Sequence, residues 1–148
     1  MRLRRYQPSD EDAAVALWLR SWLAAYPQLD FAARLDWWRE RWRNELVPSA
    51  DIVIAEVEAD GDIIGFVTVD RRTRYLDQLV AAPERWGSGV GTALIAAAKR
   101  LSPSGLDLDV NTDNARAIRF YGREGFVVSG GGVNLISGKP VHRMSWRP

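Results

Sequence analysis

The chain has 148 residues, 47% of them hydrophobic and 26% charged, a mixture typical of one globular domain over residues 1–148. A net charge of +1 argues against a dedicated nucleic-acid-binding protein, and no apolar run approaches the ~20 residues that span a membrane. The lack of cysteine excludes disulfides and thiolate chemistry. The N-terminal segment is basic and then acidic, with no apolar stretch behind it. We therefore predict no signal peptide and expect a cytoplasmic protein.

Hydrophobic periodicity predicts strands and helices in regular succession. Tryptophans at helical spacing mark two early helices, and β-branched runs around Asp60-Gly61 mark a hairpin. In chain order we expect a strand at 2–6, helices at about 11–25 and 31–46, a hairpin over 52–70, a strand at 74–82, a helix at about 89–100, a strand at 106–110, a helix over 114–125 and strands at 126–136 and 141–146. The order β-αα-βββ-α-β-α-ββ implies an α/β fold: one mixed, mostly antiparallel sheet of about seven strands with helices on both faces.

The stretch "PERWGSGVGTALIAAAKR", residues 83–100, places three alternating glycines directly before a predicted helix. The first N–H groups of a helix have no partner within the helix, and the helix dipole makes that end slightly positive. Gly87, Gly89 and Gly91 carry no Cβ that would obstruct an anion there. The pattern therefore favours a phosphate-binding loop, with a flexible turn before a helix as the alternative.

Two familiar nucleotide-binding motifs fit this loop poorly. A Walker loop requires a Lys after its last glycine, whereas Thr92 follows Gly91. A dinucleotide fingerprint requires G-x-G-x-x-G near the start of a βαβ unit, whereas this loop reads G-x-G-x-G and follows three strands of a meander. A nucleotide-phosphate-binding domain is therefore the weaker alternative.

Two linked motifs resemble the GCN5-related N-acetyltransferase superfamily. The segment "LVAAPERWGSGVGTALI" is similar to the family's strand, proline and Q/R-x-x-G-x-G/A loop, with Gly89 and Gly91 at the two loop glycines. The loop's leading Gln/Arg is replaced by Trp86, with Arg85 just before it. The segment "NTDNARAIRFYGREGF" is similar to the family's next helix and matches it at Asn114, Ala115, Ala117, Phe120, Tyr121, Gly125 and Phe126.

The resemblance implies an acetyl-CoA-dependent N-acetyltransferase in which an acceptor amine attacks the thioester directly. It implies a small-molecule or peptide amine as acceptor and makes a homodimer plausible. An acyl-CoA-binding or regulatory module without turnover is the alternative. A metal site is not expected, because His142 is the lone histidine. The residues that the resemblance assigns to acetyl-CoA are Leu79, Val80, Ala81, Arg85, Trp86, Gly87, Ser88, Gly89, Val90, Gly91, Thr92, Asn114, Ala117 and Phe120.

The resemblance also indicates catalytic residues. Tyr121 matches the family's usual proton donor to the coenzyme sulfur; an aromatic core residue is the alternative. Asp77, on the strand beside the reaction centre, is the candidate general base; a surface carboxylate or an ion pair with a nearby Arg is the alternative. Glu56 is a weaker candidate base. Asn114 suits a helix N-cap and, in the family, also contacts the coenzyme.

Five tryptophans fall in the first two predicted helices. Their amphipathic spacing favours a core role, because large aromatic side chains contribute most to burial. In the family these helices also cover the acceptor site, which makes Tyr26, Phe31 and Trp37 candidates for a pocket wall.

Overall fold

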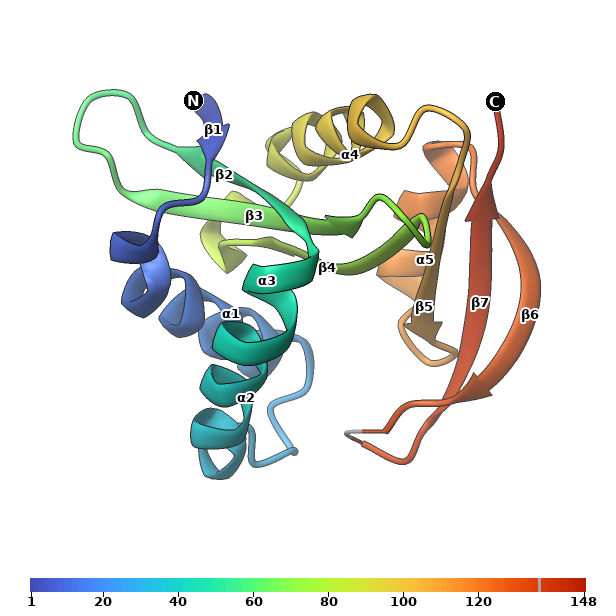
Figure 1. Ribbon diagram of the computed structural model, residues 1–148. Helices are drawn as coiled ribbons and strands as arrows, with labels where there is room; N and C mark the ends of the chain where they lie inside the picture. The colour runs from blue at the N-terminus through green and yellow to red at the C-terminus, as the bar shows by residue number, and fades with distance from the viewer. Residues whose placement is uncertain (136) are drawn as a thin grey trace.

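One mixed sheet organises the molecule (Figure 1). The computed structural model describes residues 1–135 and 137–148, and its seven strands lie in the order β1-β2-β3-β4-β5-β7-β6. Neighbouring strands are antiparallel except β4 and β5, which run parallel. The strands are β1 (Arg2–Arg5), β2 (Asp51–Glu56), β3 (Ile63–Asp70), β4 (Tyr75–Ala81), β5 (Leu106–Asn111), β6 (Val127–Val133) and β7 (Pro140–Trp146). The predicted fold class is confirmed; Ile136, within the last-but-one predicted strand, lies outside the described residues.

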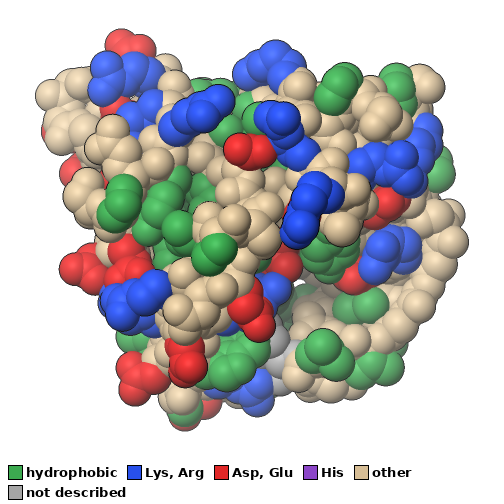
Figure 2. Space-filling model, viewed as in Figure 1, with side chains coloured by type: hydrophobic (Ala, Val, Ile, Leu, Met, Phe, Trp, Pro, Cys, Tyr) green, Lys and Arg blue, Asp and Glu red, His purple; other side chains and the backbone are tan. Residues whose placement is uncertain are grey.

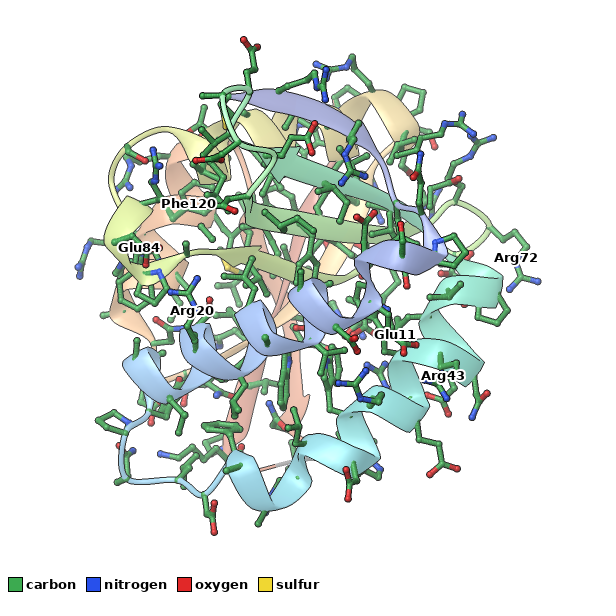
Figure 3. The ribbon with its side chains drawn as sticks, turned by 90° about the vertical axis from the view of Figure 1, so that its left-hand side faces the viewer. Glu11, Arg20, Arg43, Arg72, Glu84 and Phe120 are labelled. Atoms are coloured by element: carbon green, nitrogen blue, oxygen red, sulfur yellow. The ribbon has the colours of Figure 1, made fainter. Side chains whose placement is uncertain are left out.

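Helices cover both faces of the sheet, as predicted. The helices α1 (Glu11–Ala25) and α2 (Leu35–Arg41) lie on one face, and α4 (Val90–Leu101) and α5 (Ala115–Arg123) lie on the other (Figures 1 and 3). In the described part of the chain, no helix is long and apolar enough to cross a membrane. Short helical turns complete the chain: η1 (Pro8–Asp10), η2 (Ala32–Arg34), η3 (Trp42–Leu46), α3 (Val47–Ser49) and η4 (Pro83–Arg85).

The second predicted helix is less regular and longer than expected. A 3-10 turn precedes α2, a π-helical turn follows it at η3, and α3 continues the helix to Ser49. The predicted end near residue 46 is therefore wrong. Pro48 lies in this last turn and, because it has no N–H, it cannot donate the hydrogen bond that another residue would make there.

Stacked aromatic rings form the core between the first two helices and the sheet. Trp18 of α1 and Trp38 of α2 lie parallel with ring centroids 4.4 Å apart, and both are fully buried. Trp42 continues this layer and meets the ring of Phe66 on β3 edge-on at 5.1 Å. The predicted core role is thus confirmed for these three tryptophans, whereas Trp37 is 47% exposed.

The opposite layer depends on a close approach of α4 to β3 at Gly65. A Cβ on Gly65 would lie 2.9 Å from the Val90 and Leu94 side chains and 2.9 Å from the carbonyl oxygen of Val80. No Cβ fits at such distances, so a glycine is required where α4 crosses the sheet. Val90 is the first residue of α4, so the close approach lies at the start of this helix.

We expect Gly65→Ala to lower the free energy of unfolding by about 1–3 kcal/mol, because the added methyl forces α4 away from the strands. Gly122→Ala is the matched control, since Gly122 lies in α5 with nothing within 4 Å of an added Cβ. It should raise the free energy of unfolding by about 0.5–1 kcal/mol by reducing the entropy of the unfolded chain. Urea unfolding followed by circular dichroism measures both; equal effects would contradict the proposed crowding at Gly65.

Candidate active site

The site is built where β4 and β5 separate. Their parallel pairing is limited to Tyr75 opposite Asp107, supported by the hydrogen bond from the Asp107 N–H to the Arg74 carbonyl at 2.8 Å. Beyond this point a cavity of about 470 Å³ opens, lined by both strands and by α1, α4 and α5. In Figure 2 the surface is hollowed between the α1–α2 side of the molecule and the β6–β7 hairpin.

A β-bulge explains why β4 departs from its neighbour. The pairing of β3 with β4 skips Asp77, because Thr68 lies opposite Gln78 while Val69 lies opposite Leu76. The Thr68 hydroxyl accepts a hydrogen bond from the Gln78 N–H at 3.0 Å, which replaces a lost ladder bond. A bulge bends its strand and increases the local twist, and here the bulged residue lines the cavity.

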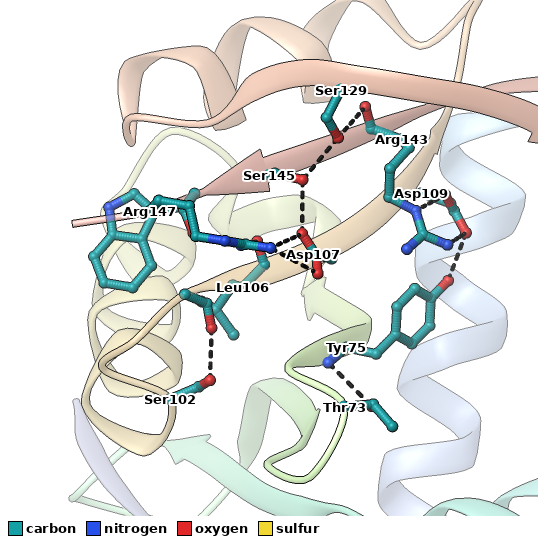
Figure 4. Close-up of polar contacts among 12 residues, drawn as sticks. Thr73, Tyr75, Ser102, Leu106, Asp107, Asp109, Ser129, Arg143, Ser145 and Arg147 are labelled. Atoms are coloured by element: carbon teal, nitrogen blue, oxygen red, sulfur yellow. Dashed lines mark hydrogen bonds and ion pairs between the residues drawn. The ribbon is translucent and has the colours of Figure 1, made fainter.

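Polar side chains hold the narrow end of this opening together (Figure 4). The Tyr75 hydroxyl on β4 donates to Asp109 on β5 at 2.9 Å, and Arg143 on β7 pairs with the same carboxylate at 2.8 Å. Burial is the main reason that the pKa of Tyr75 is raised, so its phenol remains a donor. Ser145 of β7 and Arg147 just beyond it donate hydrogen bonds to Asp107, which joins β5 to its other neighbour. The strands are thus joined at one end and free to diverge at the other.

The glycine loop enters the cavity from the end of β4. Gly87 and Gly89 have φ values of +81° and +96°, a left-handed conformation that side chains rarely adopt. An added Cβ on either would meet nothing within 4 Å, so the backbone here is open to a ligand. Gly89 is the N-cap of α4, and the first-turn N–H groups that follow have no partner within the helix. The loop is therefore suited to bind phosphate oxygens.

Helix α1 forms the wall opposite this loop. The Ser21 hydroxyl donates to the Ala81 carbonyl at 3.0 Å, and Trp22 and Ala25 line the cavity beside it. An ion pair at 3.2 Å between Arg20 and Glu84 joins the same helix to η4, from which the loop departs (Figure 3). The contact is exposed, and it stabilises the fold by little.

Most of the predicted site residues lie together in this cavity. Asn114 caps α5, because its side-chain oxygen accepts a hydrogen bond from the Ala117 N–H at 3.1 Å. Ser88 and Val90 are not among the lining residues: the Ser88 hydroxyl donates to the Arg85 carbonyl, and Val90, the first residue of α4, is buried against β3. The predicted residues that line the cavity are Asp77, Leu79, Val80, Ala81, Arg85, Trp86, Gly87, Gly89, Gly91, Thr92, Asn114, Ala117, Phe120 and Tyr121.

Tyr121 places a buried aromatic ring in the wall of the cavity. The residue is 8% exposed, and its ring packs edge-on against Phe120 at 5.2 Å and Phe126 at 5.5 Å. Among the described residues, no hydrogen bond involves its hydroxyl, although Tyr121 lines the cavity. Burial raises the pKa of the phenol, so the proton is retained at neutral and moderately alkaline pH.

The carboxylates proposed as bases both lie in ion pairs. Asp77 accepts two hydrogen bonds from the Arg41 guanidinium, at 3.0 and 2.6 Å, which favours the ion-pair interpretation over the general base. Arg41 in turn lies over the Trp38 ring at 5.5 Å. The buried Glu56 carboxylate accepts hydrogen bonds from Arg4, at 2.8 Å, and from Arg2. It is not among the residues that line the cavity.

The three candidates for the acceptor wall do not line the cavity. Phe31 is buried against Trp18, Trp37 points to solvent, and the Tyr26 hydroxyl bonds Asn111 at 3.1 Å and Asp113 at 2.9 Å. Trp22 lines the cavity instead, although its helical spacing predicts a position in the core. Gln78, Arg116, Arg123 and Asn134 were also missed, because no local pattern distinguishes them from surface polar residues.

Family comparison agrees with this geometry. The model of the acetyltransferase (GNAT) family matches residues 12–126, a region that contains the splayed strands, the glycine loop and α5. The chain belongs to the acetyltransferase (GNAT) family, and it is an N-acetyltransferase of that type.

Curated relatives extend the similarity over most of the chain. The peptidyl-lysine N-acetyltransferase YjaB of Salmonella typhimurium is 30% identical over 140 residues, covering 95% of this chain and 92% of that protein. The L-amino acid N-acetyltransferase AaaT of Escherichia coli is 31% identical over 102 residues, covering 62% of this chain and 63% of that protein.

Solved structures share the fold. The solution structure of apo YjaB from Escherichia coli superposes with a TM-score of 0.78 at 28% identity, covering 98% of this chain and 96% of that one. A putative streptothricin acetyltransferase from Bacillus anthracis, solved with acetyl coenzyme A, superposes with a TM-score of 0.60 at 25% identity over 68% of this chain and 64% of that one.

Proposed function

We propose that the protein transfers the acetyl group of acetyl-CoA to a primary amine, with the lysine side chain of a peptide or protein as the first candidate acceptor. The observation that carries the proposal is the cavity between β4 and β5, which joins the open glycine loop to a polar wall. The similarity to a peptidyl-lysine N-acetyltransferase over 95% of the chain supports the acceptor class. Similarity to an L-amino acid N-acetyltransferase makes a free amino acid the second candidate.

The proposed acetyl transfer uses residues that line the cavity. The loop at Gly87 and Gly89 binds the diphosphate, which leads the thioester toward Leu79–Ala81. The neutral amine attacks the thioester carbonyl carbon, a C–N bond forms and the C–S bond breaks. Tyr121 donates its proton to the departing thiolate, and the proton lost by the amine returns to solvent or to Tyr121. A lysine amine has a pKa near ~10.4, so it must lose a proton before attack.

An assay of coenzyme A thiol release tests the proposal. Acetyl-CoA is supplied with lysine-containing peptides, matched peptides in which arginine replaces lysine, and free amino acids. Release with the lysine peptides alone supports the proposed acceptor, and release with free amino acids supports the second candidate. If coenzyme A binds but no amine stimulates release, the protein is an acyl-CoA-binding module without turnover.

Tyr121→Phe should lower kcat by about a hundredfold or more, the usual contribution of a general acid. The variant keeps the ring that packs against Phe120 and Phe126, so the affinity for coenzyme A should change less than twofold. Tyr6→Phe is the matched control, because it also removes a tyrosine hydroxyl, one that accepts a hydrogen bond from Trp42 and does not line the cavity. Since burial raises the pKa of Tyr121, kcat should not fall with Tyr121 ionisation below pH 10. Equal kcat in Tyr121→Phe and wild type would refute the role.

The base role of Asp77 is tested against its ion pair with Arg41. If Asp77 accepts the amine proton, Asp77→Asn should lower kcat/KM for the amine at least tenfold. Arg41→Gln should cost less, because it leaves the carboxylate in place. Equal losses in the two variants, each checked by thermal unfolding, would show that the pair only positions β4.

A homodimer and a cytoplasmic location remain predictions. Every residue of β6 is exposed, and this edge strand carries Val127, Val128 and Val133, which are 65%, 54% and 63% exposed. Such an edge offers unpaired backbone groups and apolar side chains to a second copy. Sedimentation velocity of the wild type and of Val128→Lys measures this association; an unchanged monomer in both contradicts it.

A further inference from the structure

The glycine loop lacks the Gln or Arg side chain that similar loops carry at its leading position. Trp86 stands there, and its indole N–H donates to the Ala81 carbonyl at 3.0 Å. That hydrogen bond uses the only polar group of the side chain, so Trp86 offers no donor to a phosphate. It also fixes the plane of the ring beside the loop.

A cation from another element occupies the face of this ring. The Arg116 guanidinium, in the first turn of α5, lies 3.9 Å from the centroid of the Trp86 ring. Both residues line the cavity. A guanidinium held by its face keeps the N–H groups at its edge available for other acceptors.

Arg116 has no carboxylate partner within the part of the chain that the structure describes. The Arg116 side chain is exposed overall, and desolvation of its guanidinium lowers its pKa. The carboxylates Asp77 and Asp109, which also line the cavity, are already paired with Arg41 and Arg143. Among the described residues that line the cavity, Arg85, Arg116 and Arg123 make no ion pair, and Arg116 is the one held against an aromatic ring.

We propose that Arg116 binds the diphosphate of coenzyme A beside Gly87 and Gly89, and that Trp86 is the positioning residue that holds it there. An arginine donates two parallel hydrogen bonds to phosphate oxygens, a geometry that a fixed plane favours. The pair thus supplies from α5 the side-chain contact that the loop itself lacks. The inference rests on the proposed use of acetyl-CoA and makes no assumption about the acceptor.

Calorimetric titration with coenzyme A tests Arg116 directly. Arg116→Ala should raise Kd about ten- to hundredfold, the usual loss for hydrogen bonds to a charged group. Arg119→Ala is the matched control, because Arg119 is, like Arg116, an exposed arginine of α5, one turn further along, and it does not line the cavity. Equal Kd values for Arg116→Ala and Arg119→Ala overturn the proposal. If the wild type itself binds no coenzyme A, the proposed cosubstrate fails as well, which is a separate result.

A double-mutant cycle tests the positioning role of Trp86. If Trp86 acts through Arg116, Trp86→Ala should weaken binding in the wild type and have little further effect in Arg116→Ala. Trp86→Phe keeps an aromatic face and should recover part of the affinity. Additive losses, with no recovery by Phe, would show that Trp86 acts independently of Arg116. Thermal unfolding of each variant without ligand separates these effects from loss of fold.

3′-Dephospho-coenzyme A identifies which phosphate Arg116 contacts. It keeps the diphosphate and lacks the ribose phosphate, so the proposal requires Arg116→Ala to raise Kd by the same factor for both ligands. If the variant and the wild type bind the dephospho ligand equally, Arg116 contacts the ribose phosphate and the diphosphate assignment is wrong.

Discussion

The single paired position between β4 and β5 is the constraint on which the rest of the site depends. A sheet normally continues its hydrogen-bond ladder, since an unpaired buried backbone group is costly. Here Tyr75 and Asp107 pair, and the strands then diverge. The bulge at Asp77 bends β4, while Asp109 binds Tyr75 and Arg143 and keeps the narrow end closed. The backbone groups released beyond this point face a cavity, where a substrate can take the place of the missing strand contacts.

The distribution of charge divides that cavity into two ends. At the end where β4 and β5 pair, the carboxylates are neutralised, because Asp77 and Asp109 each pair with an arginine from another element. At the other end, glycines expose backbone N–H groups, and Arg116 keeps its charge uncompensated over the Trp86 ring. An anionic cosubstrate therefore has one favourable orientation in the cavity. In the proposed binding mode, the same orientation directs the thioester toward Tyr121 in the cavity wall.

Local patterns in the sequence were sufficient for the order of elements and for the loop. The helix predicted over 11–25 is the observed α1, because its periodicity and acidic first turn act within the segment itself. Asn114 caps α5 as expected, since a cap needs only the next three residues. The spacing of Gly87, Gly89 and Gly91 likewise predicts an open helix end without reference to any tertiary contact. These features depend on neighbours in the chain, and the sequence by itself determined them.

Contacts between distant residues were decided only by the tertiary structure. Arg41 and Asp77 lie 36 positions apart, and nothing in either segment identifies the other as a partner. The position of Trp22 in the cavity wall and of Arg116 over Trp86 depends on how α1 and α5 pack against the sheet. A bulge at one residue also changes which side chains face the cavity, and periodicity cannot locate it. Such features follow from packing and register, which a local pattern does not encode.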